Sequence, residues 1–415
     1  MKVVLLNTSS RTGGAAVAAA RLLRALRKQG VSVQMCVLHK EREEDWIETV
    51  EKGRCSHLLN RIRFYWERAV IFLHNHFNRS QLFRVSIANT GTDISRLPCV
   101  READVIHLHW INQGFLSLND IKQLAALGKP IVWTMHDMWS YTGVCHYASD
   151  CQSFHQMCSS CFYLDSHADK DLSTQIYQKK QQIYKKADIS FVGCSNWIAA
   201  LAKKSGLLRG KRVVDIPNPI DTKLFRPADK SKCRKDLSLP QDKRLILFGA
   251  LNVTDERKGV NYLLKALPLL KQPVELVVFG QVKSEIQELV PVPIHSLGYL
   301  SDEKKIVSLY NAVDLFVISS LDENLPNMVM EAMACGTPCV GFRTGGIPEM
   351  IDHLKNGYVA DHANEADLAK GIEWVLEHLD NKELTEACLA KVQNSYAEGV
   401  VAKRYMDLYD EISRH

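Results

Sequence analysis

The chain has 415 residues and a mass of 46.9 kDa, a length that predicts two or three domains, of which we expect two. Its composition, with 46% hydrophobic and 24% charged residues, is that of a soluble globular protein, and no apolar run reaches the roughly 18 residues of a membrane-spanning helix. A formal net charge of +5 is too small to indicate nucleic-acid binding by itself.

Short apolar runs alternate with helical patterns through the first half of the chain. The expected strands are residues 2–6, 32–38, 104–110, 130–136 and 189–195. Residues 15–30 predict the first helix. Strands separated by helices of this length form parallel sheets with helices on both faces. The first apolar run is too short for the core of an export signal, so we expect it to be a strand of a cytoplasmic protein.

The same alternation restarts after a stretch rich in proline. That stretch, DIPNPIDTKLFRPADKSK, interrupts the pattern as an interdomain linker would, and we place the boundary near Ile216. The later strands are expected at residues 244–251, 274–280, 294–300, 314–320 and 338–342. We therefore predict an N-terminal domain over 1–215, a C-terminal domain over 216–395 and a final helix over 396–415 that crosses back to the first domain. The crevice between two such domains is the expected ligand site.

The span from Arg54 to Arg84 is basic and rich in apolar residues. It contains six Arg and one acid, Glu67, and so carries a formal charge of +5. Such a segment can lie on an anionic membrane surface, with Arg61, Arg63 and Arg68 among the cations that contact it. The alternative is a helix that packs on its own domain and leaves a basic face in water.

Four of the twelve Cys are close together in the sequence. They are Cys145, Cys151, Cys158 and Cys161, in GVCHYASDCQSFHQMCSSC. Four thiols that end in a C-x2-C pair suit a tetrahedral structural zinc ion, although the first spacing is looser than in a regular zinc knuckle. The alternative is a loop of reduced thiols, as the cytosol maintains them.

Two carboxylates stand eight positions apart in DENLPNMVMEAMACG. The apolar run Leu315–Ile318 predicts a buried strand, and Pro326 and Gly336 bracket a helix of roughly ten residues. Glu323 then lies in the turn before the helix. Glu331 lies within the helix among apolar residues, where a carboxylate needs a partner. The alternative is that both are exposed to solvent, which is commoner for Glu.

A sugar nucleotide would satisfy both carboxylates. Ligands of open α/β sheets bind beyond the carboxyl ends of the strands, where helix N-termini present free N–H groups. A diphosphate can bind to the N-terminus of the predicted helix and to the turn at Gly345 and Gly346. Glu323 and Glu331 can then each accept hydrogen bonds from a pair of vicinal hydroxyls.

The sequence ENLPNMVMEAMACGTPCV resembles the Glu-x7-Glu signature of the retaining glycosyltransferases of family 4. Further motifs follow the family's order over nearly the whole chain: Gly13 and Gly14 after the first strand, DVIHLHW, VWTMHD, DIPNPIDTKLFRP, RKG and NGYVADHANEADLAKGIEWVL. The resemblance implies the α/β GT-B fold, in which two Rossmann-like doubly wound domains face each other across a crevice.

The same resemblance implies an activity and its partners. The protein would transfer a sugar from a UDP- or GDP-linked donor to a glycan or lipid-linked acceptor, with retention of configuration, in bacterial surface polysaccharide synthesis. No cofactor would be required for catalysis and no nucleic acid would bind. The enzyme would be cytoplasmic and peripheral on the inner face of the cell membrane.

The resemblance also assigns roles to residues. Glu331 would bind the donor ribose, Glu323 the hydroxyls of the transferred sugar, and Lys258 the diphosphate. Family members often have Arg directly after the glycine that ends the preceding strand. Here Ala250 follows that glycine, so we assign the second cation to Arg257 instead.

His136 ends an expected strand and would touch the donor sugar, as the corresponding His does in similar enzymes. Asp137 would orient its ring or contact the acceptor. His107 and His109 alternate on one strand, so both face the same side, and we expect packing or ring hydrogen bonds of them. The remaining candidate donor-binding residues are Gly13, Gly14, Asn324, Leu325, Pro326, Gly345 and Gly346.

Two other functions fit parts of the sequence. Nucleotide-sugar 2-epimerases share the two-domain architecture, but the order of motifs favours a transferase. A zinc-containing nucleic-acid-binding protein would explain the Cys cluster and the basic span. It would leave the paired glutamates without a role.

Overall fold

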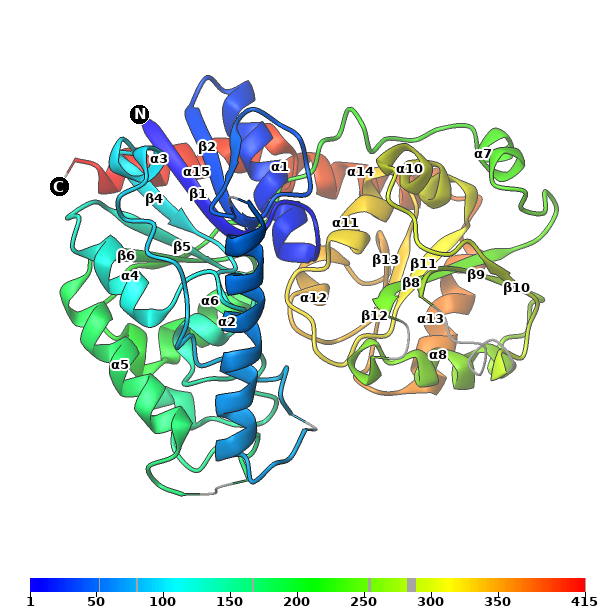
Figure 1. Cartoon of the computed structure of the whole chain (residues 1–415). Coiled ribbons are helices and arrows are strands. Elements are labelled where there is room, and N and C mark those ends of the chain that lie inside the picture. Colours follow the sequence, from blue (N-terminus) through cyan, green and yellow to red (C-terminus); the bar gives the residue numbers. More distant parts are fainter. Residues whose placement is uncertain (52, 80, 166–167, 253–254, 282–288, 415) are drawn as a thin grey trace. The chain divides into compact units, whose positions relative to one another are not determined.

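The computed structural model describes residues 1–51, 53–79, 81–165, 168–252, 255–281 and 289–414. The chain forms two compact units. Unit 1 comprises Met1–Asn218 and Val401–His415, and unit 2 comprises Pro219–Val400. Each unit is a parallel sheet covered by helices (Figure 1). This is the predicted doubly wound α/β architecture.

The sheet of unit 1 has seven strands in the order β3-β2-β1-β4-β5-β6-β7. They are β1 (Lys2–Ser9), β2 (Ser32–His39), β3 (Ile47–Thr49), β4 (Val105–Leu108), β5 (Ile131–Met135), β6 (Ile189–Gly193) and β7 (Val213–Asp215). The chain order reverses between β1 and β4. Such a switch point opens a ligand site beyond the carboxyl ends of the strands.

Helices cover both faces of this sheet. They are α1 (Gly14–Lys28), α2 (Gly53–His74), α3 (Pro98–Arg101), α4 (Leu118–Ala125), α5 (Leu172–Lys186), α6 (Asn196–Lys204) and α15 (Glu398–Ile412). Successive strand residues point to opposite faces. Val3 and Leu5 therefore pack against α1 and α15, while Val4 and Leu6 join the core on the other face, with α2, α4, α5 and α6. Strands buried on both faces explain the continuous apolar runs in the sequence.

Unit 2 repeats this plan with six strands in the order β10-β9-β8-β11-β12-β13. The strands are β8 (Leu245–Asn252), β9 (Glu275–Gln281), β10 (Ile294–Ser296), β11 (Leu315–Ile318), β12 (Cys339–Phe342) and β13 (Gly357–Ala360). The helices are α7 (Lys230–Asp236), α8 (Val260–Ala266), α10 (Glu303–Ala312), α11 (Asn327–Ala334), α12 (Ile347–Met350), α13 (Glu365–Glu377) and α14 (Lys382–Ser395). The switch point here lies between β8 and β11.

The two ends of unit 2 lie side by side. Ile220 donates its N–H to the carbonyl of Tyr396 at 2.9 Å, and Glu398 donates its N–H to the carbonyl of Ile220 at 3.0 Å. The chain therefore enters and leaves unit 2 beside a single parallel β-bridge between Ile220 and Ala397. Within the described part of the chain, none of the helices has the length and apolar character needed to cross a bilayer.

Candidate active site

A carboxylate and an ammonium group meet at the carboxyl edge of the sheet of unit 2. Lys258 ends a 3-10 turn, Glu256–Lys258, that follows β8, and Glu323 lies in the loop between β11 and α11. The Lys258 Nζ donates to Glu323 Oε2 at 2.7 Å, with side chains 32% and 16% exposed. Both groups stay accessible to a ligand, and partial exposure keeps their mutual attraction modest.

Hydrogen bonds hold the two loops of this pair together. The Ser319 hydroxyl donates to the carbonyl oxygens of Lys258 at 3.1 Å and Gly259 at 2.9 Å. The Leu321 N–H donates to the Arg257 carbonyl at 2.7 Å. Gly259 has φ +62°, and a Cβ there would collide with the Ser319 carbonyl. The close approach that sets the Lys258 position therefore requires glycine at 259.

The glycine turn at 345 and 346 packs on the loop of Glu323. Gly345 has φ +55°, and a Cβ there would collide with the Glu323 carbonyl oxygen. The Gly346 N–H donates to the Asn324 carbonyl at 2.8 Å. The close backbone approach expected of these glycines is thus made to the Glu323 loop itself.

Glu331 is buried in α11 and has a partner, as the sequence predicts. Its carboxylate accepts a hydrogen bond from the Tyr310 hydroxyl of α10 at 2.8 Å. Its neighbours Met330 and Ala332 are fully buried, while Glu331 keeps 8% of its surface exposed. Tyr310 was not identified from the sequence, because it stands 21 residues earlier on another helix.

The residues before α11 form a largely buried connection. Asn324 and Leu325 are buried, and Pro326 is the N-cap residue of the helix. Proline has no side-chain oxygen, so this N-cap residue makes no side-chain hydrogen bond to the helix. A helix start without a cap from its N-cap residue is the kind of place where an anionic ligand can bind.

Arg257, the candidate second cation, faces Asp255. Its Nη2 donates to Asp255 Oδ2 at 2.6 Å and its Nε donates to Oδ1 at 3.2 Å. This fork holds the guanidinium in a bidentate pair. Of the two cations, Lys258 is the one that the structure places directly on a candidate donor-binding side chain.

In unit 1, three histidines stack at the ends of β4 and β5. The rings of His107 and His109 lie 4.3 Å apart, and those of His109 and His136 lie 5.3 Å apart. His107 bonds Tyr409 of α15 through Nδ1 and Thr134 through Nε2, both at 2.7 Å. The expected packing and ring hydrogen bonds of His107 and His109 are confirmed.

Burial keeps this stack uncharged. It lowers the pKa of His107 to about 3 and that of His136 to about 4, and it lowers the pKa of His109 as well. His109 Nδ1 lies 3.0 Å from His136 Nε2. Among the described residues His109 Nε2 has no partner. An unpaired buried N–H costs more than an unpaired lone pair, so we assign the His109 proton to Nδ1 and the His136 proton to its own Nδ1.

Asp137 follows His136 and binds other side chains. Its carboxylate accepts from Trp110 Nε1 at 2.9 Å, His146 Nδ1 at 2.7 Å and the Trp139 N–H at 2.9 Å. Burial alone would raise its pKa, but His146 and these hydrogen bonds outweigh burial and lower it. A carboxylate held in this way fixes the segment after β5, which carries His136.

The first glycine turn is fixed by Glu41, a residue that the sequence did not indicate. Gly13 precedes α1 with φ +95°. The Glu41 carboxylate accepts from the Thr12 N–H at 2.9 Å, from the Thr12 hydroxyl at 2.7 Å and from the Ser9 hydroxyl. Burial raises the pKa of Glu41, and these hydrogen bonds lower it further than burial raises it. An acid just after β2 is the signal that could have identified it.

The four clustered cysteines lie against the core of unit 1. Cys145 and Cys158 are buried, and Cys151 and Cys161 pack on the same core. Cys158 Sγ accepts the Gly143 N–H at 3.1 Å. Within the described residues, no three side chains of His, Cys, Asp or Glu stand in positions that could hold a metal ion. This arrangement gives no support to the zinc hypothesis, which stays a prediction for metal analysis.

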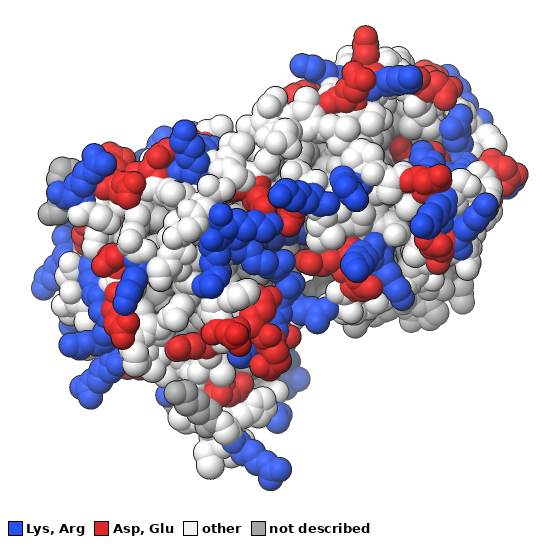
Figure 2. All heavy atoms as spheres, turned by 90° about the horizontal axis from the view of Figure 1, so that it is seen from above, with Lys and Arg blue, Asp and Glu red and all other residues white. Residues whose placement is uncertain are grey.

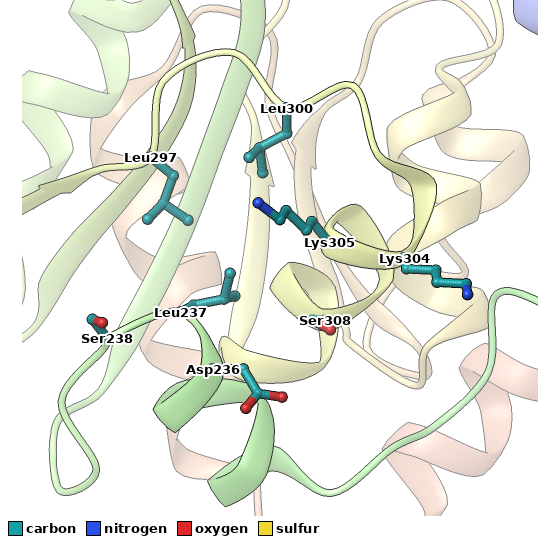
Figure 3. A pocket seen from close by; sticks show the side chains of 8 residues that line it. All are labelled: Asp236, Leu237, Ser238, Leu297, Leu300, Lys304, Lys305 and Ser308. Carbon is teal, nitrogen blue, oxygen red and sulfur yellow. The ribbon is translucent and has the colours of Figure 1, made fainter.

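Unit 2 also contains a cavity of about 410 Å³ away from these residues. It is lined by Asp236, Leu237, Ser238, Leu297, Leu300, Lys304, Lys305 and Ser308. Lys305 extends toward Leu297 and Leu300, whereas Lys304 points away (Figure 3). No candidate donor-binding residue lines this cavity, so the site at the strand ends is the stronger candidate.

Comparison with known families identifies the class of protein. The model described as Glycosyltransferase Family 4 matches residues 12–224, and the model described as Glycosyl transferases group 1 matches residues 242–378. The chain belongs to glycosyltransferase family 4, and it is a glycosyltransferase. The family inferred from the motifs is confirmed.

Relatives and solved structures agree with this assignment. WcaC of Escherichia coli K12, which carries the name of a colanic acid biosynthesis glycosyl transferase, is 24% identical over 85% of each chain. The N,N'-diacetylbacillosaminyl-diphospho-undecaprenol alpha-1,3-N-acetylgalactosaminyltransferase of Campylobacter jejuni is 27% identical over 61% of this chain and 69% of its own. Anabaena HepE, solved with UDP, is similar with a TM-score of 0.66 at 15% identity, over 99% of this chain and 100% of its own. The GT-B fold is thereby confirmed.

Proposed function

We propose that this glycosyltransferase moves a sugar from a nucleotide-diphosphate sugar to a glycan or lipid-linked acceptor, with retention of anomeric configuration. The observation that carries the proposal is the 2.7 Å pair of Lys258 and Glu323 at the carboxyl edge of unit 2. A cation for phosphate and a carboxylate for hydroxyls are the two groups that a sugar diphosphate needs.

Donor binding exchanges the partners of this pair. A diphosphate carries more negative charge than one carboxylate, so it attracts Lys258 and releases Glu323 to accept hydrogen bonds from the transferred sugar. Glu331 accepts hydrogen bonds from the ribose hydroxyls, while the Tyr310 hydroxyl keeps its hydrogen bond to Glu331 Oε2. During transfer, Lys258 stabilises the charge that develops on the leaving diphosphate.

For His136 of unit 1 we propose the role that the resemblance assigns, contact with the donor sugar. In the tautomer assigned above, His136 presents an N–H donor at Nδ1, and its Nε2 is occupied by His109. A neutral ring suits a hydroxyl partner better than a charged one, because it requires no counter-ion in a buried site. His136 therefore positions the sugar and does not act as an acid at neutral pH.

Retention follows from reaction on one face of the sugar. The bond from the anomeric carbon to the phosphate oxygen breaks, the bond to the acceptor oxygen forms on the same face, and the leaving phosphate takes the acceptor proton. A covalent route would need a carboxylate at the anomeric carbon. None of the assigned residues is given that role.

One solved structure of this fold supports a uridine donor, and the name of one relative supports a lipid-linked acceptor; the guanosine donor remains an alternative from the sequence. HepE has been solved with UDP and with UDP-glucose, and the name of the Campylobacter jejuni relative specifies a diphospho-undecaprenol acceptor. We propose that the chain uses substrates of these classes in surface polysaccharide synthesis, at the cytoplasmic face of the membrane.

The test is nucleotide diphosphate release by the whole chain over a panel of UDP- and GDP-sugars, with polyprenyl-diphosphate sugars as acceptors. Release that requires the acceptor and forms an α-linked product from an α-linked donor supports the proposal. Conversion of the donor to an isomer without an acceptor would indicate a 2-epimerase. If no sugar nucleotide of the panel releases its nucleotide diphosphate and none binds the protein in calorimetry, the assignment is overturned.

A further inference from the structure

The outward face of α2 is apolar. Of the sixteen large hydrophobic side chains that are exposed in the described chain, eight lie between residues 58 and 83, with 45% to 66% of their surface exposed. They are Leu58, Leu59, Ile62, Tyr65, Trp66, Leu73, Phe77 and Phe83. Scattered apolar residues are normal on a surface, but a contiguous group of this size marks an interaction site.

Helical geometry places most of these side chains in one stripe. Leu58, Ile62, Tyr65, Trp66 and Leu73 recur at intervals of three, four or seven residues, apart from the adjacent pair at 65 and 66, and so share a face of the helix. We call these five residues the α2 stripe. Three of the four buried residues of the helix, at 60, 67 and 71, lie about half a turn away.

The opposite face is fixed by a buried ion pair. Glu67 accepts the N–H groups of Ile87 at 2.7 Å and Ala88 at 2.8 Å, and Arg68 donates to it at 2.7 Å. Arg68 also donates to the Val85 carbonyl at 3.0 Å. The expectation that Arg68 faces lipid is therefore wrong, because its guanidinium neutralises Glu67 inside the unit. Rotating the helix to hide the stripe would break this pair.

The acid of the span is turned inward, whereas several cations remain outside. Arg54, Arg61 and Arg79 are exposed, and within the described residues none of their guanidinium groups forms an ion pair. Arg54 and Arg61 lie along one edge of the α2 stripe. Arg63 is less available, because it donates to Asn60 and Thr92.

The nearest acids at the two ends of the span are occupied. Glu51 accepts from His57 at 2.8 Å, and Asp165 accepts from Asn78 at 2.7 Å. The face drawn in Figure 2 carries side chains of both charges. The α2 stripe and its Arg residues thus form a surface that is apolar and positively charged.

We propose that the α2 stripe docks on an anionic lipid bilayer, with Arg54, Arg61 and Arg79 at the level of the headgroup phosphates. Apolar side chains flanked by Arg are the pattern of helices that lie in the membrane interface. A second copy of this chain fits less well, because two such faces would bring Arg residues of the same charge together. The inference deepens the proposed use of a lipid-linked acceptor by naming the surface that reaches the membrane.

Vesicle sedimentation of the whole chain without donor or acceptor tests this inference. We expect binding to vesicles of phosphatidylcholine with phosphatidylglycerol, little binding to phosphatidylcholine alone, and weaker binding as salt rises. The Arg54→Glu/Arg61→Glu variant should bind at least about 25-fold more weakly, from about fivefold for each cation lost. The Ile62→Ser/Trp66→Ser variant should lose binding while keeping its fold, because both side chains are already exposed.

The matched control is Lys203→Glu/Lys204→Glu on α6, which changes the net charge by the same amount at exposed residues of unit 1. It should bind like the wild type. Equal recovery in the supernatant with both kinds of vesicle at low salt would overturn the inference. So would a dimer, measured by light scattering, that the Ile62→Ser/Trp66→Ser variant abolishes. Because no sugar is transferred, failure of the proposed donor chemistry would leave this result unchanged.

Discussion

The candidate residues of the two units all lie at or near strands of a parallel sheet but differ in electrostatic character. In unit 2, Lys258 and Glu323 are charged, partly exposed and bonded to each other. In unit 1, the histidine stack is buried, uncharged and bonded to Tyr409 of α15. On the proposed mechanism, unit 2 binds the donor by exchanging ionic partners, whereas the hydrogen bonds of the histidine stack in unit 1 are already made within the fold.

The largest effect is expected from removing the cation. Lys258→Ala should lower the transfer rate by about 100- to 1,000-fold, because the charge on the leaving diphosphate loses its partner and Glu323 loses its counter-ion. Steady-state kinetics would measure this effect, with Lys265→Ala on the exposed face of α8 as the control. An undiminished rate would mean that the ion pair is structural and that unit 2 does not bind the donor through Lys258.

Neutralising the carboxylates should have a smaller effect. Glu331→Gln should weaken donor binding and Glu323→Gln should slow turnover, each by about 1.5 to 3 kcal/mol, because a charged acceptor becomes a neutral one. Calorimetry and initial rates separate the two effects, and Glu377→Gln at the end of α13 is the matched control. Wild-type constants in both variants would remove the donor site from unit 2.

Metal analysis would show whether a zinc ion, in addition to the hydrogen bonds, fixes the cysteine segment of unit 1. If the four clustered cysteines hold zinc, protein purified without added metal should contain about one equivalent. Cys158→Ser should then lower the free energy of unfolding by about 2 kcal/mol with little change in transfer rate. The exposed Cys55→Ser is the control. Metal-free protein of unchanged thermal stability would leave the cysteines as reduced core thiols.

The histidine stack predicts an acid sensitivity specific to unit 1. The pKa of His107 is lowered to about 3, against about 6.5 in an unfolded chain, so the unfolded state binds the extra proton between these values. Stability is therefore full above about pH 6.5 and falls with acidification by about 1.4 kcal/mol per pH unit for this group. Hydrogen exchange of β4 and β5 amides would measure it. His107→Gln should reduce the slope by that amount, and an unchanged slope would contradict the assignment.

Much of this architecture could be predicted from the chain. Most strands are continuous apolar runs, because both faces of each sheet are covered. The sequence around Glu323 and Glu331 predicted β11, the turn after it and α11. The strands β3, β7 and β13 were missed, because Glu48, Asp215 and Gly357 keep their three or four residues from forming a continuous apolar run. The expected strand at 294–300 is shorter than predicted, because only residues 294–296 pair with β9.

Partners distant in sequence could not be predicted. Tyr409 reaches His107 across 302 residues, and Tyr310 reaches Glu331 from a neighbouring helix. Counting charges along the basic span also misplaced Arg68. A formal charge does not show which guanidinium the fold will use to neutralise its own buried acid.

The paired ends of unit 2 have a consequence for how such enzymes can diversify. Because Ile220 bonds the backbone of Tyr396 and Glu398, the 219–400 segment starts and finishes at one place. Such a segment can be exchanged as one piece, since only two peptide bonds need to be rejoined and each lies within four residues of the bridge between Ile220 and Ala397. Grafting the corresponding segment of a relative onto this unit 1, with the junctions at 218 and 401, should give a folded chimera whose choice of nucleotide follows the graft.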